Sequence, residues 1–190
     1  MKKLSQMTLE ELWQLFPIFL VPPKDEWSTW YAEEENRLAS LLKKSAKRIS
    51  HIGSTSIEGI WAKNIVDILI ETPLGEDVSS VAEKLAQNGY IIMNSSSDRI
   101  DLNRGYTEEG FAERVFHVHL RREGDNDELY FRDYLNDHSL VAKEYEKLKL
   151  SLWKKFEHDR DGYTQAKTDF VADITEKAKA EYGLRYAEKR

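Results

Sequence analysis

An aspartate inside a run of aliphatic residues is the residue of this chain best suited to chemistry. Asp67 interrupts residues 65–70, where every other side chain is isoleucine, valine or leucine. A carboxylate in such surroundings must be hydrogen-bonded, paired with a cation or bound to a metal. Glu71 follows four residues later on the same face of an extended strand, so the two carboxylates are candidate ligands of a divalent metal. An ion pair between Asp67 and Lys63 is the structural alternative.

A turn of small residues precedes this strand. Gly53 can take a positive φ angle or allow a close approach of the backbone. Three hydroxyl residues follow it directly: Ser54, Thr55 and Ser56. Backbone N–H groups at a turn of this kind can bind phosphate oxygens, and Lys63 could add a positive charge. The spacing is not that of a P-loop, and a helix cap with no ligand explains the same residues equally well.

Two histidines fall on one face of a later predicted strand. His117 and His119 are separated by one residue, so both side chains point to the same side. With Asp67 they form the candidate catalytic set, as metal ligands, phosphate donors or a general base. His119 is also a candidate metal ligand beside Asp67 and Glu71. Partly buried histidines with ordinary hydrogen-bond partners are the alternative. His51 is expected to face the same cleft from a neighbouring strand and to bind phosphate.

Three residues of the C-terminal half are further candidates for phosphate binding. Tyr163 and Lys167 are four residues apart and share one face of a predicted helix. Arg132 lies within the run FRDYL at residues 131–135. Cations on helices usually face solvent, so a solvated surface is the alternative.

Hydrophobic periodicity predicts both strands and helices. Apolar runs predict strands at residues 48–52, 64–71, 90–93, 100–103 and 113–120, with a turn-rich connection over 104–110. Helical spacing predicts helices at 8–16, 25–44, 76–88 and 127–136, and two more that begin at 139 and 161. The strand at 64–71 is almost continuously apolar, so it should lie inside the sheet with both faces covered. Glu34 is expected at the edge of the core with its carboxylate in water.

Composition excludes several classes of function. The net charge of −6, from 28 basic and 34 acidic residues, disfavours general nucleic-acid binding. The absence of cysteine excludes disulfides, thiolate metal sites and a cysteine nucleophile. No apolar run reaches the roughly 20 residues that a membrane helix needs. Because Glu10 and Glu11 interrupt any signal sequence, we expect a cytoplasmic protein with neither a membrane nor a nucleic acid as its partner.

Several motifs in order resemble the GrpB family of small bacterial proteins. They cover residues from about 27 to 171 and read HIGSTS at 51–56, AK at 62–63, IVDI at 65–68, HVH at 117–119, FRDYL at 131–135, EY at 144–145, KL at 147–148 and YTQAK at 163–167. That family resembles the nucleotidyltransferases with the polymerase-β-like fold. The resemblance implies an α/β (α+β) fold, a mixed β-sheet flanked by helices. We expect an N-terminal helical extension at 1–24, the α/β core at 25–125, and a C-terminal helical region at 126–190 that packs on the core.

The resemblance also implies a site. In that superfamily a glycine–serine turn precedes a strand that carries two carboxylates with one residue between them. These carboxylates hold Mg²⁺ against a nucleoside triphosphate. Gly53 and Ser54 match the turn and Asp67 matches the first carboxylate, but Leu69 stands at the second position. One implied function is metal-assisted nucleotidyl transfer to an unknown acceptor, with Mg²⁺ or Mn²⁺ as cofactor. The alternative is a non-catalytic module that binds a nucleotide or another phosphorylated small molecule. Leu69 favours this alternative or a modified mechanism of transfer. A purely structural protein is a third reading.

Overall fold

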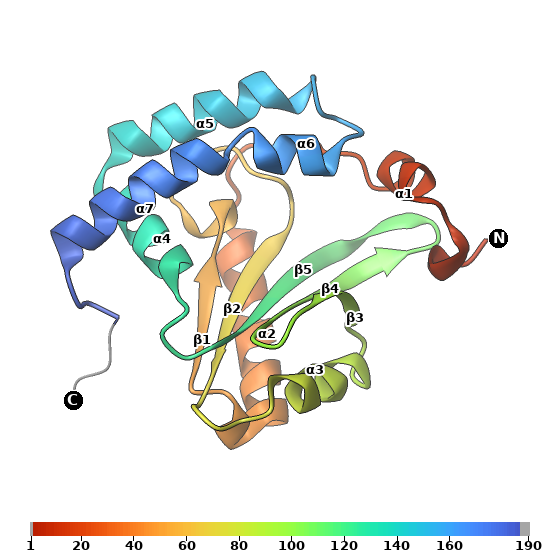
Figure 1. The fold of residues 1–190 in the computed structure, drawn as a ribbon. Helices are drawn as coiled ribbons and strands as arrows, with labels where there is room; N and C mark the ends of the chain where they lie inside the picture. Colours follow the sequence, from red (N-terminus) through yellow and green to blue (C-terminus); the bar gives the residue numbers. More distant parts are fainter. Residues whose placement is uncertain (1, 187–190) are drawn as a thin grey trace.

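A five-stranded mixed sheet forms the centre of the computed structural model, which describes residues 2–186 (Figure 1). The strands are β1 (Arg48–Ile52), β2 (Val66–Thr72), β3 (Ile91–Ser95), β4 (Arg99–Thr107) and β5 (Gly110–Arg122). Their order across the sheet is β1-β2-β5-β4-β3. β2 and β5 run parallel, and the other neighbouring pairs are antiparallel. The predicted fold class and the interior position of β2 are confirmed.

Seven α-helices surround the described sheet. They are α1 (Leu9–Leu15), α2 (Glu26–Leu42), α3 (Val78–Ala86), α4 (Asp127–Asp137), α5 (Ser139–Trp153), α6 (Arg160–Gln165) and α7 (Thr168–Tyr182). Three short 3₁₀ helices also occur: η1 (Leu4–Gln6), η2 (Lys43–Ser45) and η3 (Ser54–Ser56). The single helix predicted from residue 161 is instead two, α6 and α7. The sequence contains no proline or glycine at the break, at residues 166–167, to reveal it.

The hairpin of β4 and β5 is longer than predicted. The turn-rich connection over residues 104–110 is wrong, because β4 continues to Thr107 and β5 begins at Gly110. Gly105, with a φ of +90°, lies at a shift of register in the ladder. Such a bulge lets two strands stay paired while the hairpin twists, so the hairpin extends as one long arm.

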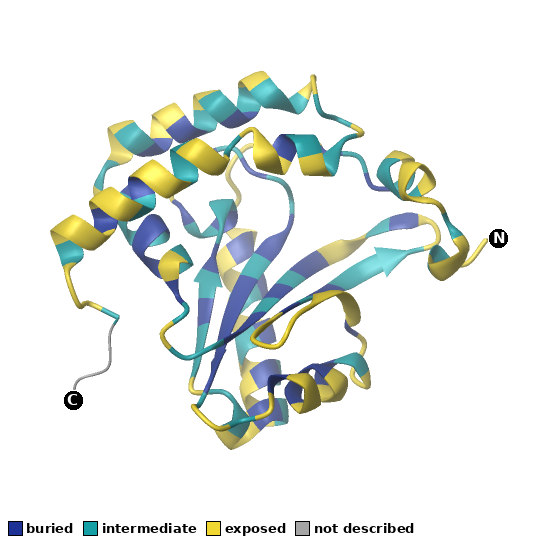
Figure 2. Ribbon diagram, viewed as in Figure 1, coloured by how far each residue is buried: buried dark blue, intermediate teal, exposed yellow. Residues whose placement is uncertain are grey.

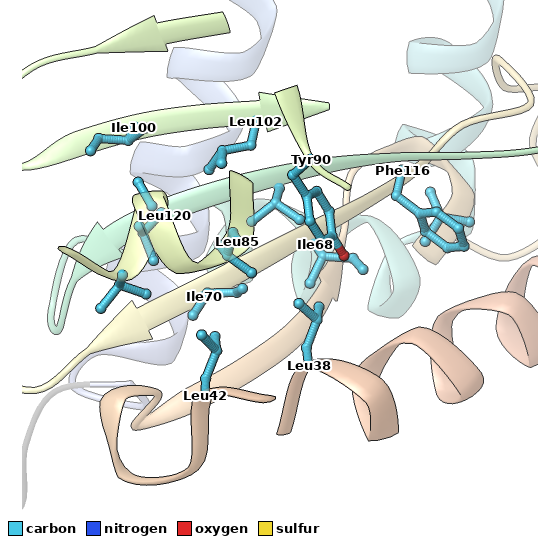
Figure 3. Packing of buried hydrophobic residues seen from close by; sticks show 14 of the residues in the cluster. Leu38, Leu42, Ile68, Ile70, Leu85, Tyr90, Ile100, Leu102, Phe116 and Leu120 are labelled. Carbon is cyan, nitrogen blue, oxygen red and sulfur yellow. The ribbon is translucent and has the colours of Figure 1, made fainter. Parts of the chain in front are cut away.

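Alternation along the strands gives the sheet two different faces. One face carries aliphatic side chains that pack against α2 and α3 in the main core (Figure 3), among them Ile68, Ile70, Leu102, Val118 and Leu120. The other face carries Asp67 and His117, and the C-terminal helices lie on that side (Figures 1 and 2). The polar face is therefore enclosed between two halves of the chain.

Glu34 of α2 is buried, contrary to the prediction that its carboxylate reaches water. Its side chain is 5% exposed and accepts hydrogen bonds from Arg104 Nη1 at 2.7 and 2.9 Å. Arg37 Nη2 donates at 2.8 Å, and the Tyr90 hydroxyl also donates. Burial would raise the pKa of Glu34, but the hydrogen bonds from these partners lower it. Donors from α2, β4 and the residue before β3 thus make a buried carboxylate tolerable here.

The segment that joins α1 to α2 ties the helical half to the sheet; we call residues 17–21 the strap. Ile18 donates its N–H to the carbonyl of Glu157 at 2.7 Å, and its own carbonyl accepts from Trp153 Nε1 at 2.7 Å. Val21 pairs with Ala62 in an isolated bridge. Since the strap contacts both halves, it helps to close the space between them. Within the described chain, no helix combines the length and the apolar character that crossing a membrane requires.

Candidate phosphate-binding site

Asp67 lies at the centre of a hydrogen-bonded cluster on the polar face of the sheet. The parallel ladder pairs Asp67 with His117, and the antiparallel ladder pairs His119 with Asp101 on β4. His117 Nδ1 and His119 Nε2 both lie 3.3 Å from Asp67 Oδ1. The predicted shared face of the two histidines is therefore confirmed. Lys63 forms no ion pair with Asp67 in the described structure, because the histidines surround the carboxylate instead.

His119 bridges two carboxylates. Its Nδ1 lies 3.1 Å from Asp101 Oδ1, and Arg121 Nη2 donates to the same oxygen at 2.7 Å. Burial would lower the pKa of His119, but the hydrogen bonds that its ring donates to Asp101 and Asp67 raise that pKa to about 9. Burial would likewise raise the pKa of Asp67, and the two histidines hold it well below its usual range. His119 is therefore a cation at neutral pH.

The other histidine is neutral. Burial lowers the pKa of His117 to about 4, although Asp67 opposes this. Arg160 Nη1 donates to the Tyr106 hydroxyl at 2.8 Å, and that hydroxyl lies 2.8 Å from His117 Nε2. Because the Tyr106 oxygen accepts from Arg160, its proton points to Nε2, and the Nδ1–H of His117 then donates to Asp67. Asp67 is thus oriented from both sides.

The glycine of the small-residue turn is required by Asp67. Gly53 has a φ of +70°, and a Cβ at this position would overlap the carboxylate of Asp67. Both the backbone angle and the close approach exclude a larger residue. The turn therefore brings Ser54 next to the strand, where Ser54 lines the same cavity as Asp67.

Three lysines converge on that cavity from different elements. The cavity measures about 20 Å³ and is lined by Leu20, Ser54, Lys63, Ile65, Asp67, Lys149, Tyr163 and Lys167. Burial lowers the pKa of Lys63 to about 7, of Lys149 to about 7 and of Lys167 to about 8. Lys149 is 2% exposed and donates to the carbonyl of Trp61. Lysine amines buried around one cavity lose solvation and repel one another, so the cavity favours an anion.

Tyr163 adds an unpaired polar group to the same cavity. Its side chain is 1% exposed, and its hydroxyl has no hydrogen-bond partner among the described residues. Nearly every buried hydroxyl in a folded protein has a partner. The orphan hydroxyl therefore marks a place where a ligand oxygen or a water completes the structure. The predicted candidates Ser54, Lys63, Asp67, Tyr163 and Lys167 thus lie together.

His51 does not join them. The register pairs His51 with Ile68, so its side chain lies on the face opposite Asp67. Its ring stacks on Tyr31 with the centroids 4.8 Å apart, and its Nε2 lies 3.0 Å from Thr55 Oγ1. The prediction that His51 shares the cleft is wrong by one position in the strand, and the hydroxyl of Thr55 is engaged with it.

Two more predicted phosphate ligands are used within the fold. The hydroxyl of Ser56 donates to the carbonyl of Gly53 at 2.7 Å. Arg132 Nη1 donates to the carbonyl of His51 at 2.9 Å, and its Nη2 donates to Asp133 at 2.7 Å. These contacts fasten the turn and α4 to the sheet, so neither side chain faces the lysine cavity.

The structure does not assemble the predicted metal site. Glu71 lies four residues along β2 from Asp67, a rise of about 13 Å. It instead pairs with Arg48 at 3.2 Å and accepts from Asn126 Nδ2 at 2.9 Å. In the part of the chain that the structure describes, no group of three or more His, Asp or Glu side chains is placed to hold a metal ion. Leu69 is fully buried where a second carboxylate would be needed, so these residues do not fit a two-metal clamp.

Asp101 and Lys149 are site residues that the sequence analysis did not single out. Asp101 alternates with Ile100 and Leu102, a pattern that places it on the polar face of β4. The buried positions of α5 are Ala142, Tyr145 and Lys149, so the lysine occupies an apolar position of the helix. In both cases, a charged residue at a position where the sequence pattern expects an apolar one could have identified the site residue.

The fold is similar to that of solved proteins with a nucleotidyltransferase-like fold. The solved structure of the GLD-2/RNP-8 complex, which has this fold, superposes with a TM-score of 0.54 at 11% identity, over 90% of this chain and 70% of that one. At this identity the likeness concerns the fold alone. The chain itself belongs to the GrpB family, whose family model (GrpB protein) matches residues 17–177. The crystal structure of the conserved protein GrpB from Enterococcus faecalis has a TM-score of 0.73 and 26% identity, over 86% of this chain and 99% of that one.

Relatives of different lengths share this unit. The chain is 34% identical over 164 residues to the glutamate-rich protein GrpB of Alkalihalophilus pseudofirmus, covering 83% of this chain and 93% of that protein. It is 33% identical over 183 residues to the UPF0157 protein YqkA of Bacillus subtilis, covering 93% of this chain but only 52% of YqkA. It is 25% identical over 187 residues to a dephospho-CoA kinase of Mycolicibacterium paratuberculosis, covering 46% of that protein. The family match also includes the strap, which the sequence motifs left outside.

Proposed function

We propose that the chain binds a phosphorylated small molecule through the lysine cavity and that this binding needs no metal ion. The observation that carries the proposal is the convergence of Lys63, Lys149 and Lys167 on the unpaired hydroxyl of Tyr163. Three ammonium groups and a hydroxyl donor match the charge and the acceptor oxygens of a phosphate group.

The charge of the site supports this choice of ligand. Asp67 is the one acidic residue that lines the cavity as described, against three lysines, in a chain whose net charge is −6. A local excess of positive charge in an acidic protein is unfavourable without an anion. Because the space of about 20 Å³ holds only one or two water molecules, the lysine side chains must swing outward to admit a phosphate.

Nucleotidyl transfer is the second candidate, favoured by the fold and by the Gly53–Asp67 contact. The metal clamp of that reaction has no counterpart here: Leu69 packs with Ile52 and Leu129, and His119 lies against Asp67. In our proposal the lysines supply, from the protein, the positive charge that metal ions supply in such transferases. The chain then keeps the phosphate-handling part of the fold.

Calorimetry and thermal unfolding with phosphate, pyrophosphate and a nucleoside triphosphate, each in EDTA and in Mg²⁺, test the proposal. A ligand at 100 times its Kd adds about 2.7 kcal/mol of stability. We expect this gain in EDTA, and we expect Lys167→Met to remove it. Lys147→Met, a change of an exposed lysine on α5, should leave it intact. Stabilisation that appears only with Mg²⁺ would support nucleotidyl transfer instead, and no stabilisation by any phosphate would end both proposals.

A further inference from the structure

A second, larger cavity lies beside the lysine cavity. It measures about 400 Å³ and shares Lys63 and Ile65 with the smaller one. The strap also separates the two, since Phe19 lines the large cavity and Leu20 the small one. Lys63 and Ile65 line both cavities, and their Cα atoms can be at most about 7 Å apart. A ligand of modest size is therefore long enough to reach from one cavity to the other.

The long β4–β5 hairpin creates this cavity. β5 begins at Gly110, but its pairing with β2 begins only at Phe116. Residues 110–115 therefore lie beyond the first residue of β2, and this part of β5 lines the cavity together with residues of the strap and α2. Figure 1 shows the hairpin projecting beyond β2 toward α1. The space left at this free edge is the large cavity, which Phe111 and Glu113 line from β5.

Three aromatic rings form part of the apolar wall of this cavity. Phe19, Trp30 and Phe111 come from the strap, α2 and β5. The rings of Phe19 and Phe111 are 6.3 Å apart in an edge-to-face arrangement, and Phe19 remains 39% exposed. An exposed aromatic side chain that lines a cavity is available to pack against the flat face of a ligand.

The polar part of the wall offers both donors, from Lys24 and Lys63, and acceptors, from two carboxylates. Asn64 lines the cavity, and its Oδ1 accepts from Trp27 Nε1 at 2.8 Å, which fixes the amide. Glu26 and Glu113 add two carboxylates that are exposed at the surface. Carboxylates accept hydrogen bonds from amino and N–H groups, which purines and pyridines with amino or hydroxyl substituents provide.

We propose that the large cavity binds the planar ring of the same ligand whose phosphate occupies the lysine cavity. The ligand class is therefore a phosphomonoester that carries a heteroaromatic ring. This inference rests on the proposed function, because the lysine cavity must hold the phosphate. The site that it adds is the one for the ring, between the strap, α2 and the free edge of β5.

Direct binding of four probes by calorimetry tests the second site. Adenosine 5′-monophosphate and pyridoxine 5′-phosphate carry different rings, whereas ribose 5-phosphate and inorganic phosphate carry none. We expect at least one of the ring-bearing probes to bind about tenfold more tightly than ribose 5-phosphate, a ratio typical of one aromatic contact. The two ring-bearing probes distinguish a nucleotide from a pyridine phosphate.

Two variants test whether the preference for ring-bearing probes arises in the large cavity. Phe19→Ala should remove most of the preference for the ring and leave the affinity for inorganic phosphate unchanged. The matched control is Leu74→Ala, an exposed apolar side chain beyond the opposite end of β2. Equal affinities for all phosphate esters, or a ring preference that survives Phe19→Ala, would overturn the second site while the phosphate site stands. Failure of every probe, inorganic phosphate included, would overturn both.

Discussion

Replacing Lys149 with methionine should stabilise the ligand-free protein and weaken its binding of phosphate. The side chain is 2% exposed, and burial lowers the pKa of its amine from 10.5 to about 7. At pH 7 the unfolded chain holds this proton fully and the folded chain holds it about half the time, a penalty of about 4 kcal/mol on folding. Leaving the carbonyl of Trp61 without its donor offsets about 1–3 kcal/mol of the gain. A net gain of about 2 kcal/mol would raise Tm by about 4–8 °C.

The pH dependence of stability gives an independent measure. A lysine whose folded pKa lies below its unfolded pKa makes stability rise with pH between the two values, because the unfolded state then binds more protons. Removing Lys149 should therefore lower the slope by about 1.4 kcal/mol per pH unit between about pH 7.5 and 10. His119 acts in the opposite direction: its raised pKa contributes stability that is complete below 6.5 and is lost as pH rises through about 9. This second contribution is common to both proteins and cancels in the comparison.

Urea unfolding followed by tryptophan fluorescence at several pH values measures both quantities. Lys147→Met makes the same chemical change at an exposed position of α5 and should alter neither stability nor slope appreciably. A Lys149→Met protein that is less stable than the wild type, or that keeps the full slope, would show that Lys149 is not a desolvated cation. Lys149 would then bring no desolvated positive charge to the cavity, and this charge is the main electrostatic reason to expect an anion there.

Three further predictions follow from the same geometry. Gly53→Ala should cost at least about 2 kcal/mol in urea unfolding, because alanine disfavours a positive φ and its Cβ meets Asp67. Leu69→Asp, which restores the second carboxylate of the transferases, should destabilise the fold by about 3 kcal/mol or more and gain no Mg²⁺ binding in calorimetry, because position 69 is fully buried against Leu129. Binding of phosphate near pH 8 should take up protons, up to about two per ligand, as the anion raises the pKa of the three lysines, which calorimetry in buffers of different ionisation enthalpy measures.

The parts of the site that lie on one strand were predictable from the sequence. Alternation places His117 and His119 on one face, and the apolar run around Asp67 marks an interior strand. The glycine of the turn was recognisable because a positive φ and a close approach both require it. These inferences depend on local geometry, which the order of residues determines directly.

Features that depend on register or on distant elements were not predictable in the same way. His51 is one residue from Ile52, and only the pairing of β1 with β2 decides which of the two faces Asp67. Glu34 needs Arg104 and Tyr90, which are distant in the sequence, to make its burial tolerable. Tertiary contacts of this kind have no local pattern, so periodicity alone placed Glu34 at the edge of the core with its carboxylate in water.

Leu69 and the lysine cavity lie on the same face of the sheet. In β2 the side chain of Leu69 packs with Ile52 and Leu129, so a carboxylate there would be buried among apolar groups. A transferase that loses this ligand cannot hold its metal pair, and the phosphate then lacks a counter-charge. Lys149 and Lys167 come from α5 and the α6–α7 junction, elements that lie over the polar face of the sheet. Their amines bring positive charge from the side opposite the sheet, so in our proposal the cavity binds a phosphate without the metal pair that a second carboxylate at position 69 would help to hold.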